Sequence, residues 1–373
     1  MSLANLFTVS SFSSFFLFPL FISHHGGSKS DIGVMMGVSA LSSVLSRPWI
    51  SEMIDRIGRK KSYTFGCLFM SLLPLLYLQF KGDLASFYYP LMLVRLLHGV
   101  GLSLCLTAPS TYIADIIPHG RLNEGIGTFG AFSLLGMAVG PAISEILIKQ
   151  YGFSVFFISA GALGALGLLI HLPLAESYRH GVKKRSDSFF KILMKRKVMM
   201  IALLALLFGF GLSAYGGFVS PFAKEKQIQH ISFYFIAYAL AALFSRVIGG
   251  KIGDRIGEAR ILPYALVLTG SGLLLLVFLG GLWILVISGL MTGSGHGLLF
   301  PCLNALAIRN ESIEIRGKMI GIFTGGIDAG IFLGSIMLGY IGEWSGFHAI
   351  FFVAGLALFI GLGLHKLVGR EEK

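Results

Sequence analysis

The residues of this chain most capable of chemistry are ionisable side chains inside or beside long apolar stretches, namely Asp328, Arg95, His98 and Glu145. If the stretch around Asp328 is a helix that begins near Gly317, its carboxyl lies roughly 16 Å along the axis, near the middle of a hydrocarbon layer about 30 Å thick. A carboxylate at that depth is costly unless it is paired, protonated or in contact with a water-filled cavity. We therefore predict that Asp328 carries a coupling proton, with Arg95 or His98 as its basic neighbour.

The other three residues allow two readings each. Arg95 lies about 10 Å from the outer end of a helix that starts near Tyr88, so its side chain either serves the proton site or extends along the helix to the surface. His98 follows one turn later on a similar face, either as a titrating group or as a neutral buried histidine with one hydrogen bond. Glu145 precedes Lys149 by one turn. It is either an interfacial carboxylate or a second proton site.

Other kinds of site find little support in the sequence. Cys67, Cys105 and Cys302 are far apart and form no metal-ligand or disulfide pattern, and the ten histidines are scattered apart from His24 and His25. We expect no metal and no cofactor. A membrane-embedded enzyme remains an alternative from a different class, although no nucleophile with a neighbouring base is visible.

The composition indicates a membrane protein. The chain of 373 residues is 55% hydrophobic and 13% charged, with 49 glycines and a mean hydropathy of +0.79. A soluble domain needs roughly twice that charge on its surface. Twelve spans of about 20 residues would fit and leave about 130 residues for loops. The spans are expected to begin near Leu3, Asp31, Ser62, Phe87, Gly125, Phe153, Val198, Ile231, Ile261, Leu282, Met319 and Phe347.

The positions of the charges predict the topology. The net charge of +12 does not indicate nucleic acid, because most of the 30 lysines and arginines fall in alternate loops. Those loops are cytoplasmic by the positive-inside rule, which places both termini inside. The first apolar stretch lacks the flanks of a cleavable signal, so it is expected to be a retained helix. The lysines left in outer loops are Lys29, Lys81, Lys149, Lys224 and Lys226.

The sequence contains an internal repeat of one six-span unit. A basic cytoplasmic connector, residues 173–197, separates an N-terminal half, residues 1–172, from a C-terminal half, residues 198–373. At one constant offset, glycines of the two halves coincide, and at this offset Asp328 corresponds to Leu134. The acid therefore does not belong to the repeated scaffold. The coinciding glycine pairs are Gly99 and Gly293, Gly101 and Gly295, Gly136 and Gly330, Gly140 and Gly334, and Gly152 and Gly346.

A second repeated signature lies at the end of the second span of each half. Residues 47–58 contain an arginine, a small residue, then Asp-Arg, a spacer and Gly, and residues 246–257 repeat the pattern. Arg47 and Arg246 sit where a helix is expected to end, and we expect them to anchor it at the cytoplasmic surface.

These segments resemble the major facilitator superfamily. Residues 47–60 and their second copy are similar to that family's loops between helices 2 and 3 and between helices 8 and 9. Residues 95–101 resemble its helix 4 motif, with His98 where glutamine is common, and Ser51 stands where the loop usually has glycine. The resemblance implies an all-α fold of two pseudo-symmetric six-helix bundles that works by alternating access.

Two site roles follow from the resemblance. Gly136, Gly140 and Pro141 look like the helix 5 motif associated with proton-driven antiporters, and Arg95 stands at a position that the family links to proton coupling. The loop motif is expected to act as a conformational latch: a negative charge faces the N-terminus of helix 11, and arginines pair with an acid at the end of helix 4. The residues of this latch are Asp55, Arg56, Arg59, Asp115, Asp254 and Arg255.

The sequence therefore predicts a monomeric transporter of the cell membrane, driven by protons and exporting a small amphipathic or drug-like organic molecule. A proton symporter that imports a nutrient is the alternative. Few polar residues are expected to line the central cavity, which suits a weakly polar solute. These cavity candidates are Ser10, Ser14, Tyr215, Ser294, His296 and Asn304.

Overall fold

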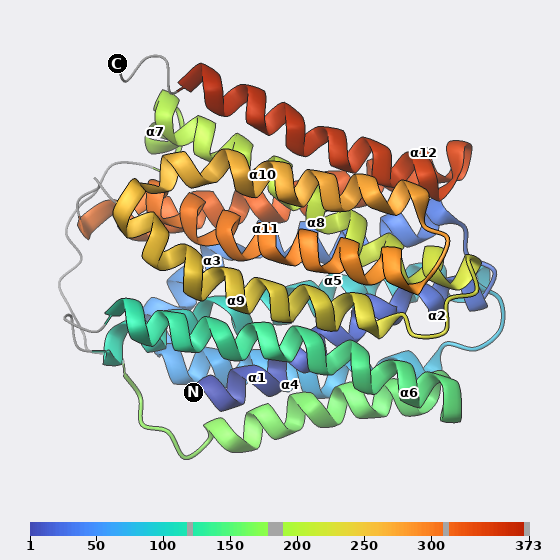
Figure 1. Ribbon diagram of the computed structural model, residues 1–373. Helices are drawn as coiled ribbons and strands as arrows, with labels where there is room; N and C mark the ends of the chain where they lie inside the picture. The colour runs from blue at the N-terminus through green and yellow to red at the C-terminus, as the bar shows by residue number, and fades with distance from the viewer. Residues whose placement is uncertain (118–121, 178–188, 309–312, 369–373) are drawn as a thin grey trace.

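The computed structural model describes residues 1–117, 122–177, 189–308 and 313–368, and in these residues it is built of helices joined by short turns (Figure 1). Side chains are described except at 122–126, 189–190, 249–256, 313–317 and 366–368. The elements are α1 (Ser2–Ser14), η1 (Phe15–Leu17), α2 (Phe18–His24), α3 (Lys29–Ile57), α4 (Arg59–Leu76), η2 (Tyr77–Gln79), α5 (Leu84–Ile116), α6 (Leu122–His171), α7 (Phe189–Leu193), α8 (Arg196–Glu225), α9 (Ser232–Ile256), α10 (Glu258–Leu275), η4 (Leu276–Phe278), α11 (Leu282–Ile308) and α12 (Ile313–Val368).

These helices account for the twelve predicted crossings. Among the described residues, eight helical stretches are long and apolar enough to span a membrane. Two of them, residues 127–171 and 318–365, have 45 and 48 residues, enough for two crossings each. α6 turns back at Gly152 and α12 at Gly346, with φ of 79° and 78°. Both values lie in the left-handed region that glycine adopts without a steric penalty. α3 and α9 supply the remaining two crossings.

The helices form two bundles that correspond to the two halves of the sequence. α1 packs on α6, and α5 packs on α3 and α4, while in the other half α8 packs on α12 and α11 packs on α9 and α10. The bundles meet where α3 lies against α12 and α6 lies against α9. In Figure 1 the chain ends lie toward the left, which we call the termini end, and the turns between α2 and α3 and between α8 and α9 lie at the far end.

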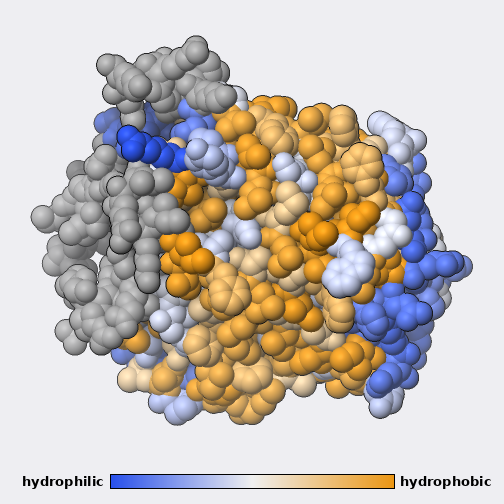
Figure 2. Space-filling view, viewed as in Figure 1, coloured by the Kyte–Doolittle hydropathy of each residue, from blue (hydrophilic) through white to orange (hydrophobic). Residues whose placement is uncertain are grey.

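The outer surface matches a lipid environment. Figure 2 shows a broad hydrophobic band across the molecule and hydrophilic residues gathered at the far end. Trp283 and Trp344, 77% and 81% exposed, lie beside the far-end turns. Tryptophans at this level are typical of the boundary between hydrocarbon and lipid headgroups.

The repeated glycines let equivalent helices touch through their backbones. A Cβ at Gly140 of α6 would lie 2.3 Å from the Ser10 carbonyl oxygen of α1, and a Cβ at Gly330 of α12 would lie 2.0 Å from the Leu206 carbonyl oxygen of α8. Lipid gives no hydrophobic drive to helix association, so such close approach stabilises the bundle through packing. The predicted repeat is therefore visible as equivalent contacts, α6 on α1 and α12 on α8.

Candidate functional site

An ion pair joins the two halves at the contact between α3 and α12. Arg47 Nε donates to Asp328 Oδ2 over 2.8 Å, and a second guanidinium nitrogen contacts the same oxygen. Ser43 Oγ also donates to this oxygen, over 3.0 Å, and Arg47 donates to Thr324 Oγ1 over 3.2 Å. The side chains of Arg47 and Asp328 are only 16% and 12% exposed. Asp328 is thus held by a charged partner from the opposite bundle.

This partner differs from the predicted one. Asp328 was expected to lie beside Arg95 or His98, and Arg47 was expected to anchor a helix end; both expectations were wrong. α3 continues to Ile57, so Arg47 lies well inside the helix and its side chain turns toward α12. The sequence shows how deep a residue lies in a span but not which neighbouring helix its face meets.

Arg95 and His98 form a separate cluster within the N-terminal bundle. Arg95 Nε donates to the Met35 carbonyl oxygen over 3.0 Å, and its guanidinium lies 4.9 Å from the centre of the Phe18 ring. His98 Nδ1 lies 3.3 Å from the Tyr77 hydroxyl, and its Nε2 is buried without a hydrogen-bond partner. In the part of the chain that the structure describes, no carboxylate pairs with Arg95. A role of this cluster in proton transfer stays a prediction.

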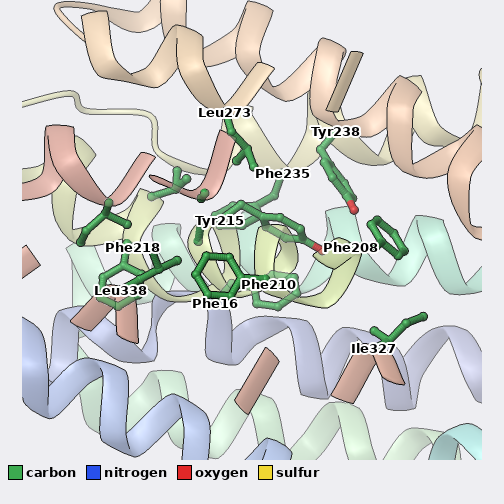
Figure 3. Packing of buried hydrophobic residues seen from close by; sticks show 14 of the residues in the cluster. Phe16, Phe208, Phe210, Tyr215, Phe218, Phe235, Tyr238, Leu273, Ile327 and Leu338 are labelled. Carbon is green, nitrogen blue, oxygen red and sulfur yellow. The ribbon is translucent and has the colours of Figure 1, made fainter. Parts of the chain in front are cut away.

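The centre of the molecule, between the bundles, is filled by aromatic side chains. Figure 3 shows Phe16 beside Tyr215 and Phe235, with Tyr238 and Phe208 toward one side. The Phe16 ring stacks on Phe235 at 5.2 Å and meets the Tyr215 ring edge-on at 5.8 Å. Phe16 belongs to the N-terminal half and the others to the C-terminal half. The halves therefore touch here through apolar surfaces that can separate without breaking ion pairs.

The predicted cavity residues divide between this centre and helix packing. Tyr215 contacts Tyr238, whose hydroxyl bonds to His296 Nδ1, so Tyr215 and His296 belong to the aromatic centre. Ser10 and Ser14 are fully buried where α1 packs on α6, and Ser14 Oγ donates toward the Gly140 carbonyl oxygen over 3.4 Å. These two serines were not correctly assigned to a cavity, because α1 turns them toward α6.

Two further predicted residues lie on α11. Ser294 and Asn304 are partly exposed, and Asn304 Oδ1 is buried without a hydrogen-bond partner. Asn304 follows His296 by two turns, so the two share a face of α11.

Arg246 of α9 also points inward, although it was expected to anchor a helix end. Its guanidinium lies 5.6 Å from the centre of the Phe300 ring, and its Nε is buried without a hydrogen-bond partner. One terminal nitrogen lies 2.5 Å from the place where a Cβ at Gly130 of α6 would stand. Arg246 therefore reaches across to the opposite bundle, into space where a side chain at position 130 would otherwise lie. The repeated motif was the signal for this residue, but it did not show the direction of the side chain.

Two glutamates close the far end. Glu145 of α6, 5% exposed, accepts hydrogen bonds from the backbone nitrogens of Ile231 and Ser232 over 2.8 and 2.7 Å, and it pairs with Lys149 over 2.8 Å. Since α9 begins at Ser232, the carboxylate satisfies the free N–H groups at a helix start in the opposite bundle. This geometry favours a structural role for Glu145.

Glu343 of α12 does the same for α3. Its Oε2 accepts from the backbone nitrogens of Lys29 and Ser30 over 2.9 and 3.4 Å, and α3 begins at Lys29. Sequence reasoning missed Glu343, because a glutamate beside an outer turn carries no distinctive signal.

Some of the contacts predicted for the latch are present at the termini end, while its role in the conformational change stays a prediction. Arg59 Nε donates to Asp115 over 2.9 Å, as predicted, and Arg59 also pairs with Asp55 over 3.3 Å. Arg56 was expected to bind Asp115, but it bonds to Glu52 of its own helix over 2.6 Å. The predicted helix 11 is the first part of α12, which begins at Ile313 rather than near Gly317. The side chains at that start, and those of Asp254 and Arg255, lie outside the described part of the chain.

Two similar bundles, close glycine contacts between equivalent helices and charged residues at the contact of the halves are features that a whole family can share. A sequence profile described as Major Facilitator Superfamily matches residues 1–236 and 226–373. The chain belongs to this superfamily. It is a multi-pass membrane protein and a transporter of small molecules rather than an enzyme.

Individual relatives agree with this assignment. The chain is 25% identical over 350 residues to the "Multidrug resistance protein MdtG" of Salmonella arizonae, covering 91% of this chain and 85% of the relative. It is 25% identical over 371 residues to the "MFS-type transporter SLC18B1" of Mus musculus, covering 93% and 79%. Among solved structures, a POT family transporter in complex with a thioalcohol conjugated peptide has a TM-score of 0.81 at 13% identity, covering 99% and 95% of the two chains. This last likeness supports the fold.

Proposed function

We propose that this protein exports a small amphipathic organic molecule from the cytoplasm in exchange for protons, as a monomer in the cell membrane with both termini inside. The observation that carries the proposal is the ion pair between Arg47 and Asp328. It joins the halves through two side chains that are largely removed from solvent, where a carboxylate is stable only when it is paired or protonated. Proton uptake by Asp328 removes the charge that holds Arg47 and so weakens the contact of α3 with α12.

The contacts at the far end support the side from which the substrate is proposed to enter. Glu145 and Glu343 tie the outer ends of α6 and α12 to α9 and α3, so this conformation is closed at the far end. Under the predicted topology the far end is external, and a substrate then enters from the cytoplasmic side. Opening the far end requires both carboxylates to leave the helix starts that they cap.

The chemistry of the centre supports the substrate class. Aromatic surfaces such as those of Phe16, Phe235 and Tyr215 bury apolar groups of a ligand, while a few polar groups orient it. The relatives named multidrug resistance proteins support export of such molecules. The halves are proposed to be residues 1–172 and 198–373, joined by the connector 173–197, of which residues 178–188 lie outside the described part.

The test uses purified protein in proteoliposomes and a panel of anionic, neutral and cationic naphthalene compounds. If the protein exchanges substrate for protons, a panel member accumulates in vesicles with an acidic lumen and not without a pH gradient. Accumulation only with an alkaline lumen would instead establish the symporter. If no panel member and no broader drug library moves with either gradient, the proposal of proton coupling is wrong.

A further inference from the structure

We propose that Arg246 binds a negatively charged group of the transported molecule, so that the substrate is an amphipathic organic anion. This inference rests on the proposed transport function and adds the charge of the substrate. Arg246 lies at the contact of the two halves, beside the aromatic centre, and no role within the scaffold accounts for its charge.

The repeat provides the first argument, because it contains the same arginine twice. Arg47 reaches from α3 to α12, where it contacts Thr324 and, one turn later, Asp328. Arg246 reaches from α9 to α6, where one of its terminal nitrogens lies beside Gly130. Gly130 is the counterpart of Thr324 in the repeat. One turn after Gly130, where the counterpart of Asp328 should stand, the chain has a leucine.

That residue, Leu134, is 2% exposed. The first arginine therefore has a carboxylate built into the protein, whereas the repeat has an apolar residue at the place equivalent to that carboxylate in the other half. Among the described side chains, none with a negative charge pairs with Arg246.

Burial provides the second argument. A guanidinium stays charged under all ordinary conditions. The cost of holding it in apolar surroundings therefore cannot be lowered by loss of a proton. The Nε of Arg246 is buried without a partner, and the ring of Phe300 offers only a weak attraction over 5.6 Å. Arg246 as a whole is only partly exposed, and a charge largely removed from water without a counter-charge is unfavourable. A carboxylate, sulfonate or phosphate from a ligand can supply that counter-charge with two parallel hydrogen bonds.

The surroundings fit the rest of such a ligand. Phe300 and His296 stack at 6.0 Å along one face of α11, and Phe208 lies 5.0 Å from His296 on the side of α8. These rings offer an apolar surface next to the charge. Asn304 continues the same face of α11, and its buried Oδ1 accepts no hydrogen bond from the described residues. A cationic molecule would meet the guanidinium with like charge, which disfavours binding.

The first experiment measures binding to the purified full-length protein. The probes are 1-naphthoate, its neutral analogue 1-naphthamide and the cation 1-naphthylmethylammonium, and the readout is the shift in melting temperature with ligand concentration. We expect 1-naphthoate to stabilise the wild type and the other two to bind at least tenfold more weakly. Arg246→Gln should weaken 1-naphthoate binding by on the order of tenfold to a hundredfold, and Arg246→Lys should retain part of it.

The matched pair Leu134→Asp and Leu134→Asn tests the mechanism without touching Arg246. The aspartate copies the arrangement of Asp328 and should neutralise Arg246, so that 1-naphthoate binding is lost. The asparagine is of nearly the same size and uncharged, and it should leave most of the binding intact. If size-exclusion chromatography shows that the Leu134 variants do not fold, the comparison of Arg246→Gln with Arg246→Lys decides whether the charge of Arg246 binds the ligand.

The outcomes separate this inference from the proposed function. Equal binding of 1-naphthoate and 1-naphthamide, or unchanged binding in Arg246→Gln, would overturn the anion site. Accumulation of the cationic probe in an acidic lumen, with no effect of 1-naphthoate, would leave the proposed exporter standing and refute the inference. Arginine-dependent binding of 1-naphthoate without any movement driven by a pH gradient would support the site and refute proton coupling.

Discussion

Removing either partner of the Arg47–Asp328 pair should destabilise the protein, but by unequal amounts. Two opposite charges about 4 Å apart attract by about 4 kcal/mol at an effective dielectric constant of about 20. Breaking a buried pair typically costs about 3–5 kcal/mol, because the remaining charge is left without compensation. Since both side chains are less than one-fifth exposed, we expect Asp328→Asn to fall within this range. In this variant the guanidinium of Arg47 stays charged and keeps the hydroxyl of Thr324 as a partner.

Arg47→Gln should cost less, about half as much, because a stranded carboxyl can bind a proton and become neutral. The double variant should be no less stable than Asp328→Asn alone, since it leaves no unpaired charge. Melting temperatures of the four proteins in one detergent form a double-mutant cycle, and we expect a coupling energy of about 1–3 kcal/mol. In proteoliposomes Asp328→Asn should still exchange substrate but should no longer accumulate it with a pH gradient.

Two results would refute this reasoning. Additive effects of the two substitutions on stability would mean that the pair contributes no coupling. An Asp328→Asn protein that still concentrates substrate with a pH gradient would show that the proton binds elsewhere.

Three further predictions concern the far end, the packing and the topology. Glu145→Gln should lower stability by about 1.5–3 kcal/mol through weaker bonds to the start of α9, and spin-label distances between the far ends of α6 and α9 should lengthen; unchanged distances would contradict a closing role. Gly140→Val should lower stability by about 1–3 kcal/mol or more because its side chain would meet the backbone of α1, whereas Gly363→Ala, with open space around it, should change the melting temperature little. A cysteine at Gln227 should react with impermeant reagents in intact cells and one at Gly181 should not, and the reverse pattern would invert the topology.

The sequence predicted the helices well because their limits depend on local properties. Hydropathy predicted span starts near Leu282, where α11 begins, and near Asp31, two residues from the start of α3. Hydropathy also predicted span starts near Phe153 and Phe347, directly after the turns at Gly152 and Gly346, whose backbone angles glycine adopts at no cost. These features need no knowledge of which helices are neighbours.

The partners of the charged residues could not be predicted in the same way. Asp328 is buried between α3 and α12, but its partner depends on the rotation of α12 relative to α3, which hydropathy does not specify. Arg47 and Arg246 looked like anchors because long arginine side chains often extend to the surface from helix ends. Both instead turn inward. Glu145 likewise meets the start of α9 rather than water, because of the rotation of α6 relative to α9.

The difference between the two copies of the arginine predicts how transport should respond to membrane voltage. If Asp328 takes a proton inward while Arg246 releases an anion outward, each step moves positive charge inward. A cycle with one of each moves two charges, and a potential of about 100 mV, inside negative, contributes about 4.6 kcal/mol, more than a thousandfold in accumulation. Export should therefore be accelerated by an inside-negative potential, set with potassium and valinomycin at constant pH. Leu134→Asp should remove this response to 1-naphthoate, because a protein with its own carboxylate at both arginines has no unpaired charge left to attract an anion.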